Sequence, residues 1–140
     1  MNRNLLNRNL LSCNLLNRNL LSRNRMSSDP NCIFCKIVAG QIPAKKAYED
    51  EQLLAFHDIN PWAPVHILVI PKAHITSMVD TGPEHSDLLG RMMAVTPRLM
   101  AELGVNNGYR HIINTGTDGR QEVMHLHLHV MGGPRPWLKG

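Results

Sequence analysis

The sequence has no long apolar run and few cysteines, and its first part has no acidic residue. No apolar segment approaches the roughly 20 residues that a helix needs to cross a bilayer, which excludes a membrane-spanning protein. Three cysteines, an odd number, do not suit a disulfide scaffold in a chain of 140 residues. Two of them, Cys32 and Cys35, form a C-x-x-C pair, so the cysteines favour a reducing, cytoplasmic compartment and a metal-binding or redox role.

The first 25 residues differ from the rest of the chain. Residues 2–21 are four copies of a five-residue unit (NRNLL, NRNLL, SCNLL and NRNLL), a period that matches neither a helix nor a strand. Together with the following SRNR, they hold five of the 15 basic residues and none of the 11 acidic ones. Residues 26–140 therefore carry 10 basic against 11 acidic residues, and the electrostatic support for nucleic-acid binding disappears.

We interpret residues 1–25 as a low-complexity arm, disordered or a mis-assigned start, and residues 26–140 as one domain. A transit peptide and an amphipathic membrane-surface helix are weaker alternatives, because the Asn-Leu repeat is unlike either. A short tandem repeat in the coding sequence gives such a pattern when it is translated. We therefore hypothesise that Met26 is the biological start, which mass spectrometry would refute by finding Met1 retained in the native protein.

The hydrophobic pattern of the domain predicts an α+β fold. We expect a short helix over residues 32–39 and a long helix over residues 82–103 with a kink at Pro97. Short strands are expected at residues 47–48, 52–57, 66–70, 109–114 and 123–131. Hairpin-like strands with few helices indicate an antiparallel sheet.

The segment that carries the chemistry is His-Leu-His-Leu-His-Val-Met, at residues 125–131. Because strand side chains alternate between faces, His125, His127 and His129 are expected on one face, with about 7 Å between each histidine and the next. The intervening apolar residues, Met124 among them, would pack on the core. A solvated polar face explains one histidine, but three in alternation each need a partner and titrate together, so the pattern indicates a functional site.

This segment resembles the signature of the histidine triad (HIT) family, His-φ-His-φ-His-φ-φ with φ apolar, at every position. The resemblance spans about residues 32–137 and includes further segments in the family's usual order. These are Cys32-Ile-Phe-Cys-Lys-Ile, Ile42-Pro43-Ala44, Ala55-Phe-His-Asp-Ile, Ala63-Pro64-x-His66, Ile70-Pro71-Lys72-x-His74-Ile75, Asn114-x-Gly116 and Gln121-Glu-Val-x-His125. Gly132-Gly133 resembles the Hint branch, the purine nucleoside phosphoramidases, whereas the branch that cleaves dinucleoside polyphosphates more often has proline there.

The resemblance implies a HIT-like fold, an antiparallel sheet of about five strands with one long and one short helix, in a homodimer. It also implies a hydrolase of purine nucleoside phosphoramidates, cleaved at the P–N bond, and of aminoacyl-adenylates. The reaction would pass through a nucleotidyl-His127 intermediate and release the nucleoside monophosphate. A neutral imidazole suits this role because it attacks phosphorus without first losing a proton. Neither a catalytic cofactor, a nucleic acid nor a membrane is expected as a partner.

The family match also assigns roles to single residues. His129 donates to a non-bridging phosphate oxygen, and His125 and Gln121 complete the catalytic set. Asp58 takes both ribose hydroxyls, although by itself it would be read as a turn-capping residue. Further nucleotide-binding positions, of which the apolar ones alone would be read as core, are Ile33, Phe34, Phe56, His57, Ile59, Leu68, Asn114 and Glu122.

Some family members bind structural zinc through such a cysteine pair and two histidines. The resemblance places these ligands at Cys32, Cys35, His66 and His125, which would make a closed tetrahedral site. The alternative is a pair of buried thiols that pack as small hydrophobic side chains. His74 is expected on the surface or in a loop.

Other interpretations of the domain remain open at this point. Arg120 stands where close relatives often have glycine, so it either strains a turn with positive φ or contacts the leaving group or phosphate. A dinucleoside polyphosphate hydrolase and a nucleotide-binding protein with weak activity are two alternatives. A zinc enzyme that uses the triad itself as ligands is a third, and it predicts that chelators abolish activity.

Overall fold

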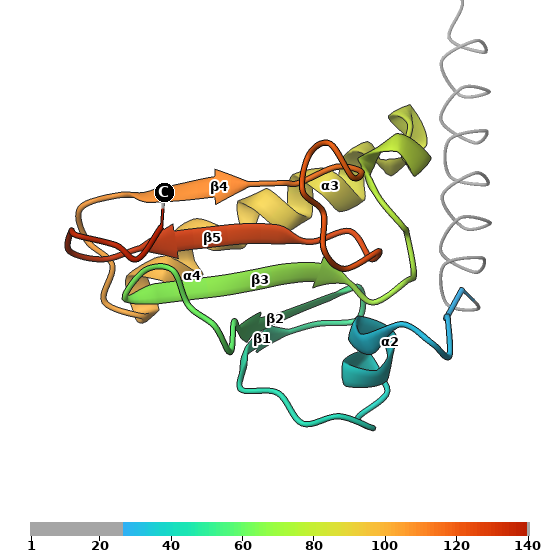
Figure 1. The fold of residues 1–140 in the computed structure, drawn as a ribbon, viewed down its shortest axis with the longest axis horizontal. Helices are drawn as coiled ribbons and strands as arrows, with labels where there is room; N and C mark the ends of the chain where they lie inside the picture. The colour runs from blue at the N-terminus through green and yellow to red at the C-terminus, as the bar shows by residue number, and fades with distance from the viewer. Residues whose placement is uncertain (1–26, 140) are drawn as a thin grey trace, which may run out of the picture.

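A computed structural model describes residues 27–139, so the predicted arm and Met26 lie outside the described residues. Five antiparallel strands form one sheet in the order β1-β2-β3-β5-β4 (Figure 1). Their bounds are β1 Lys46–Glu49, β2 Leu53–His57, β3 Val65–Pro71, β4 Tyr109–Ile112 and β5 Leu128–Gly132. The predicted α+β class with an antiparallel sheet of five strands is confirmed.

The helices include a short one, α2 (Ile33–Val38), and a longer helical segment that is interrupted as expected near Pro97. That segment contains the 3-10 turn η2 and two α-helices, and a second 3-10 turn precedes it. The bounds are η1 Met78–Asp80, η2 Pro83–His85, α3 Ser86–Ala94 and α4 Thr96–Glu102. None of the helices among residues 27–139 is long and apolar enough to cross a membrane.

The break between α3 and α4 has a local cause. Pro97 has no N–H to donate to the carbonyl four residues earlier, which belongs to Met93. The hydroxyl of Thr96 donates to that carbonyl oxygen instead, at 2.7 Å. The carbonyl is therefore satisfied, and the helical segment continues after one turn residue.

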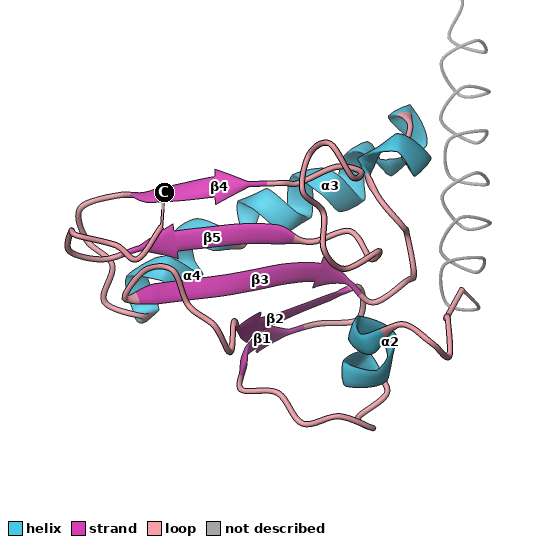
Figure 2. Ribbon diagram, in the orientation of Figure 1, coloured by secondary structure: helices cyan, strands magenta, loops and turns pink. Residues whose placement is uncertain are grey.

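Different helices pack on the two faces of the sheet. α3 and α4 lie along one face (Figure 2), where Ala55, Val69 and Leu128 stand opposite one another in neighbouring strands. Leu88 of α3 and Met100 of α4 belong to the same buried core. On the other face, α2 packs its buried residues against those of β2 and β3. This second core consists of Cys32, Phe34, Cys35, Ile37, Leu54, Phe56, Leu68 and Ile70.

The last strand is shorter than the sequence predicts. β5 begins at Leu128, and the residues before it bond to the segment that follows β3 instead of to a neighbouring strand. Leu126 donates its N–H to the carbonyl of Ile75 at 2.7 Å. Leu126 is buried as expected, but Met124 is 43% exposed, so its predicted place in the core is wrong.

Candidate functional site

The three histidines of the 125–131 segment lie in different backbone settings. His129 belongs to β5 and pairs with Leu68 of β3, so it lies on the α2 face of the sheet. His125 and His127 precede the strand, and both are buried. The His127 and His129 rings stand edge to face with centroids 4.9 Å apart, while the His125 ring packs edge-on against that of His74.

His127 is held in one tautomer. Its Nδ1 lies 2.7 Å from the main-chain carbonyl oxygen of His125. A carbonyl only accepts, so Nδ1 carries the proton and Nε2 holds the lone pair. Burial lowers the pKa of His127, which keeps the ring neutral at pH 7. Its Nε2 is therefore an uncharged nucleophilic nitrogen.

A second group of side chains includes His129 itself. It consists of Asp58, His66 and His129 and is named the carboxylate–imidazole cluster. The backbone N–H of Trp62 donates to His66 Nδ1 at 3.1 Å, so the proton of the neutral His66 ring is on Nε2. That Nε2–H donates to His129 Nδ1 at 2.9 Å. His129 consequently carries its own proton on Nε2 and can donate it onward.

The carboxylate–imidazole cluster holds neutral rings beside one carboxylate. Burial lowers the pKa of His129 to about 4, and the neighbouring His127 and His66 rings act in the same direction. Burial also lowers the pKa of His66, against the attraction of Asp58. Asp58 Oδ2 is 3.6 Å from His66 Nε2, while Oδ1 accepts the N–H of Asn60 at 2.8 Å. Asp58 thus caps a turn and also faces the histidine pair.

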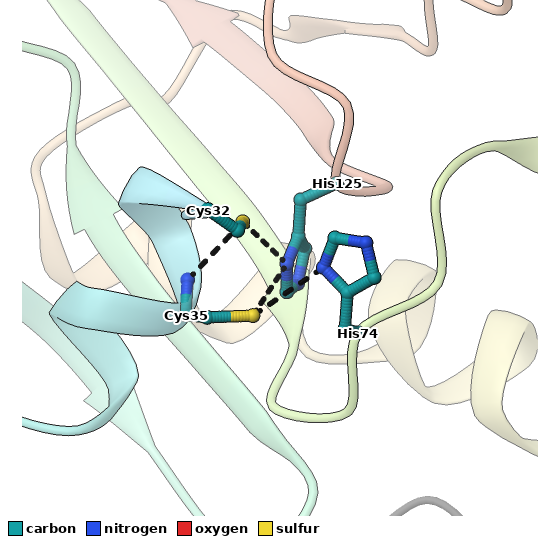
Figure 3. Close-up of side chains that lie close together, drawn as sticks. All are labelled: Cys32, Cys35, His74 and His125. Atoms are coloured by element: carbon teal, nitrogen blue, oxygen red, sulfur yellow. Dashed lines mark hydrogen bonds between the residues drawn. The ribbon is translucent and has the colours of Figure 1, made fainter. Parts of the chain in front are cut away.

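A third group, Cys32, Cys35, His74 and His125, is named here the thiol–imidazole cluster, and its side chains point toward one another (Figure 3). Nδ1 of His125 lies 3.4 Å from Sγ of Cys32 and 3.6 Å from Sγ of Cys35. Cys35 Sγ lies 3.3 Å from His74 Nδ1. A tetrahedral zinc ion holds such ligand atoms about 3.3–3.8 Å apart, so the donor set and spacing fit that ion.

Protonation within the thiol–imidazole cluster also suits a cation. His125 donates Nε2–H to the carbonyl of Pro71 at 2.8 Å, which leaves the Nδ1 lone pair facing the sulfurs. Burial raises the pKa of the Cys32 thiol and lowers that of His125 to about 4. A cation would offset the cost of a buried thiolate. Cys35 also lines a cavity of about 520 Å³ together with Lys72 and Arg91.

The expectation that His66 lies with the two cysteines is wrong, and His74 lies beside them instead. His66 lies at the start of β3, next to His129, whereas the two cysteines pack near the other end of that strand. After Pro71 the chain turns back toward α2, and this turn brings His74 to Cys35. Both histidines stand in quoted family motifs, so motif membership did not distinguish them.

The expected base-binding residues divide into two sets. Phe34, Phe56 and Leu68 are buried together on the α2 face, with the two phenylalanine rings edge to face at 5.4 Å. Phe34 also packs edge-on against His127 at 5.3 Å, so this apolar wall adjoins the His127 ring. His57 is half-buried at the end of β2. The side chains of Ile33 and Ile59, at 47% and 91% exposed, remain outside the buried wall.

The two amide side chains expected at the phosphate are used within the loop that precedes the triad. Gln121 donates from Nε2 to the carbonyls of Thr76 and Val123, and its Oε1 accepts the N–H of Gly116. Asn114 donates from Nδ2 to the Gly119 carbonyl at 2.7 Å. In this structure both amides therefore act as positioning groups. Glu122, the remaining loop residue of the set, is exposed.

Two further observations concern residues beside the site. Trp62 was not expected at the site, yet its N–H fixes the His66 tautomer and its ring stacks on that of His129, with the centroids 6.2 Å apart. Its place before Ala63-Pro64-x-His66 was the available signal. Arg120 has a φ of 60°, which agrees with the first of its two interpretations, a turn with positive φ.

Comparisons with known proteins agree with this geometry. Residues 39–135 match the family described as HIT domain. Protein HitA of Neisseria gonorrhoeae is 52% identical over 104 residues, which cover 74% of this chain and 97% of HitA. A solved HIT family hydrolase from Legionella pneumophila Philadelphia 1 is 44% identical with a TM-score of 0.72, over 75% of this chain and 95% of that one. A Zn-bound histidine triad family protein from Mycobacterium smegmatis is 39% identical with a TM-score of 0.67, over 75% and 76% of the two chains.

Proposed function

The chain belongs to the HIT domain family, and on that premise we propose that it hydrolyses purine nucleoside phosphoramidates at the P–N bond, and aminoacyl-adenylates, releasing the nucleoside monophosphate. The observation that carries this proposal is the hydrogen bond from His127 Nδ1–H to the His125 carbonyl. It leaves an uncharged Nε2 lone pair at the end of an apolar wall. The hydrolase among the solved relatives supports the reaction class.

The reaction proceeds by two displacements at the α-phosphorus. His127 Nε2 attacks phosphorus and forms an N–P bond, while the bond to the leaving amine breaks and its electron pair goes to the amine nitrogen, which takes up a proton from solvent. Water then attacks the same phosphorus, and the N–P bond to His127 breaks with its electron pair returning to Nε2. The proton that the water loses passes to solvent, and the monophosphate is released. Two in-line steps retain configuration overall. His129 Nε2–H would donate to a non-bridging oxygen and stabilise the charge that develops there.

The base would stack on the apolar wall formed by Phe34, Phe56 and Leu68. This wall is shaped by α2, β2 and β3 and offers no polar group that would select one purine. The ribose would lie toward Asp58, whose Oδ2 is the carboxylate oxygen near His66. A ribose hydroxyl at that oxygen would share it with the His66–His129 pair.

The thiol–imidazole cluster is proposed to hold structural zinc through Cys32, Cys35, His74 and His125. A bound ion would supply charge to the two sulfurs and link α2 to the loop after β3 and to the triad segment. Zinc held by the triad rings themselves is not favoured, because His125 faces the sulfurs and His127 Nδ1 faces a carbonyl. We therefore expect catalysis to need no metal-bound water.

A homodimer in a reducing, cytoplasmic compartment completes the proposal. β4 lies at one edge of the described sheet, where a second chain has access to its backbone groups. Cys32 and Cys35 are both unbridged and buried, as thiols in a reducing compartment would be. Light scattering on the full chain under reducing conditions tests the dimer.

The experiment for the activity is a single-turnover assay of the full chain with adenosine 5′-phosphoramidate, with and without a chelator. We expect AMP release that resists the chelator, and a transient adenylyl adduct in the intact-protein mass. His127→Ala should abolish adduct and release while AMP binding largely survives. His85→Ala is the matched control, because His85 lies in η2. AMP release from His127→Ala at the wild-type rate would disprove the nucleophile.

Diadenosine polyphosphates are the comparison substrates in the same assay. Faster turnover of these than of the phosphoramidate would place the chain with the dinucleoside polyphosphate hydrolases. AMP binding without turnover of either substrate would indicate a nucleotide-binding protein instead.

A further inference from the structure

One residue, His125, connects the thiol–imidazole cluster to the proposed nucleophile. Its Nδ1 faces the sulfurs of Cys32 and Cys35 at 3.4 and 3.6 Å. Its main-chain carbonyl accepts the Nδ1–H of His127 at 2.7 Å. The ring is fully buried in close-packed surroundings, so a movement of His125 at the sulfurs also moves the carbonyl that binds His127.

Phe34 makes a second connection between the same two groups. It lies in α2 between the two cysteines, and its side chain is only 6% exposed. The ring stands edge-on to His125 at 5.8 Å and to His127 at 5.3 Å. Whatever fixes Cys32 and Cys35 therefore also fixes the wall against which His127 packs.

Without an ion, the hold on His125 is uneven. Its Nε2–H has a strong partner in the Pro71 carbonyl at 2.8 Å, whereas Nδ1 meets only sulfur atoms. Thiols are weak hydrogen-bond donors, so these contacts restrain the ring little. A zinc ion would replace them with one coordinate bond to His125 and one to each sulfur. Both ring nitrogens of His125 would then be held, and the ring would in turn restrain the main-chain carbonyl of the same residue.

We infer that an ion in the thiol–imidazole cluster and a nucleotide at His127 stabilise the same conformation, so that the two sites are coupled through His125 and Phe34. This inference rests on the proposed function. Both residues act as positioning residues for His127 in this coupling. Because coupling is reciprocal, zinc must raise the affinity for AMP by the same factor by which AMP raises the affinity for zinc.

The test measures binding, so it does not depend on turnover. The Kd for Zn²⁺ is measured on the full chain by competition with a chromophoric chelator, with and without saturating AMP. The Kd for AMP is measured by calorimetry with and without bound zinc. We expect both constants to fall by the same factor, about fivefold or more. A Kd for Zn²⁺ that AMP leaves unchanged would overturn the inference.

Phe34→Leu tests the route and separates it from a general effect of folding. It keeps all four cluster side chains and the His125 carbonyl contact but removes the ring between His125 and His127, so zinc should still bind while the coupling factor falls below the wild-type value. Ile37→Leu is the matched control, because Ile37 is buried on the same helix and in the same core. If zinc raised the affinity for AMP only by stabilising the folded chain, both variants would show the wild-type coupling factor. That result would contradict the inference.

Failure of the proposed function is distinguishable from failure of this inference. If AMP binds neither the zinc-loaded nor the chelated protein, the proposed nucleotide site is wrong. The remaining readout is then the ¹⁵N chemical shifts of the His127 ring at fixed pH, which report the hydrogen bond that Nδ1–H donates to the His125 carbonyl. Zinc should shift the Nδ1 resonance, because it holds that carbonyl in place. Identical shifts with and without zinc would overturn the coupling by itself.

Discussion

His125 and His66 are both buried imidazoles in clusters of potential metal ligands, and each has one ring nitrogen bound to the backbone. The partner differs. His125 donates Nε2–H to the Pro71 carbonyl, whereas His66 accepts the Trp62 N–H at Nδ1. The other ring nitrogen of His125, Nδ1, therefore carries a lone pair, whereas the other ring nitrogen of His66, Nε2, carries a proton that it can donate.

This difference separates two groups that look alike in composition. Each has ligand atoms within 4.8 Å of one another. In the thiol–imidazole cluster the His125 lone pair faces the two sulfurs, which suits a cation. In the carboxylate–imidazole cluster His66 donates a hydrogen bond to His129, which leaves the His129 proton on Nε2 and suits a donor to phosphate. The backbone partner of a histidine therefore decides its chemistry more than its neighbours in the cluster do.

The largest expected difference between the clusters is in zinc content. Replacing both cysteines, Cys32→Ser with Cys35→Ser, should reduce bound zinc from about one ion per chain to almost none. His66→Gln should leave zinc content unchanged, because His66 lies in the other cluster. Elemental analysis of the purified full chains measures both. Loss of zinc in the His66 variant with retention in the double serine variant would reverse our assignment of the clusters.

A smaller effect is expected on catalysis when the His66 donor is removed. His66→Leu leaves His129 Nδ1 without its donor at 2.9 Å, so the His129 proton is no longer fixed on Nε2. We expect kcat to fall about tenfold or more. His66→Gln, which keeps an N–H donor near the Nε2 position, should recover most of that loss. The dependence of kcat on pH should change in the leucine variant, and a merely structural role would leave its shape unaltered.

Lowering the pH tests whether the imidazole rings of the carboxylate–imidazole cluster are neutral. The pKa of His129 falls to about 4 in the folded chain from an ordinary 6.5. Its contribution to stability is therefore complete above pH 6.5 and is lost as the pH falls toward 4. Between pH 7 and 4.5 the wild-type chain should lose about 1–3 kcal/mol more of its free energy of unfolding than His129→Asn, as measured by urea unfolding. An equal decrease in the two proteins would assign the acid sensitivity elsewhere.

The smallest expected effect lies outside both clusters, at Arg120. Its φ of 60° lies in the left-handed region that favours glycine. Arg120→Gly should therefore raise the free energy of unfolding by about 0.5–1 kcal/mol, measured by urea unfolding. Zinc content should stay at the wild-type level, because Arg120 contributes to neither cluster. A loss of stability would show that the arginine side chain compensates for its backbone strain.

The sequence predicted the elements better than the ends of the elements. Apolar periodicity located both helical regions and all five strands, and Pro97 located the interruption, because these features depend on neighbouring residues. The start of β5 was predicted too early. Strict alternation looks the same in a strand and in an extended segment, and only the bond from Leu126 to the Ile75 carbonyl shows that residues 125–127 leave the ladder.

For this protein the sequence alone determined the family resemblance, the C-x-x-C pair and the face occupied by Leu126, Leu128 and Val130, because each is a matter of spacing along the chain. Tertiary structure decided which histidine joins the cysteines. His66 and His74 are eight positions apart, and the turn after Pro71 sends them to different clusters. It also decided the tautomers of His66, His125 and His127, since each depends on a backbone group that is distant in sequence or set by a local turn.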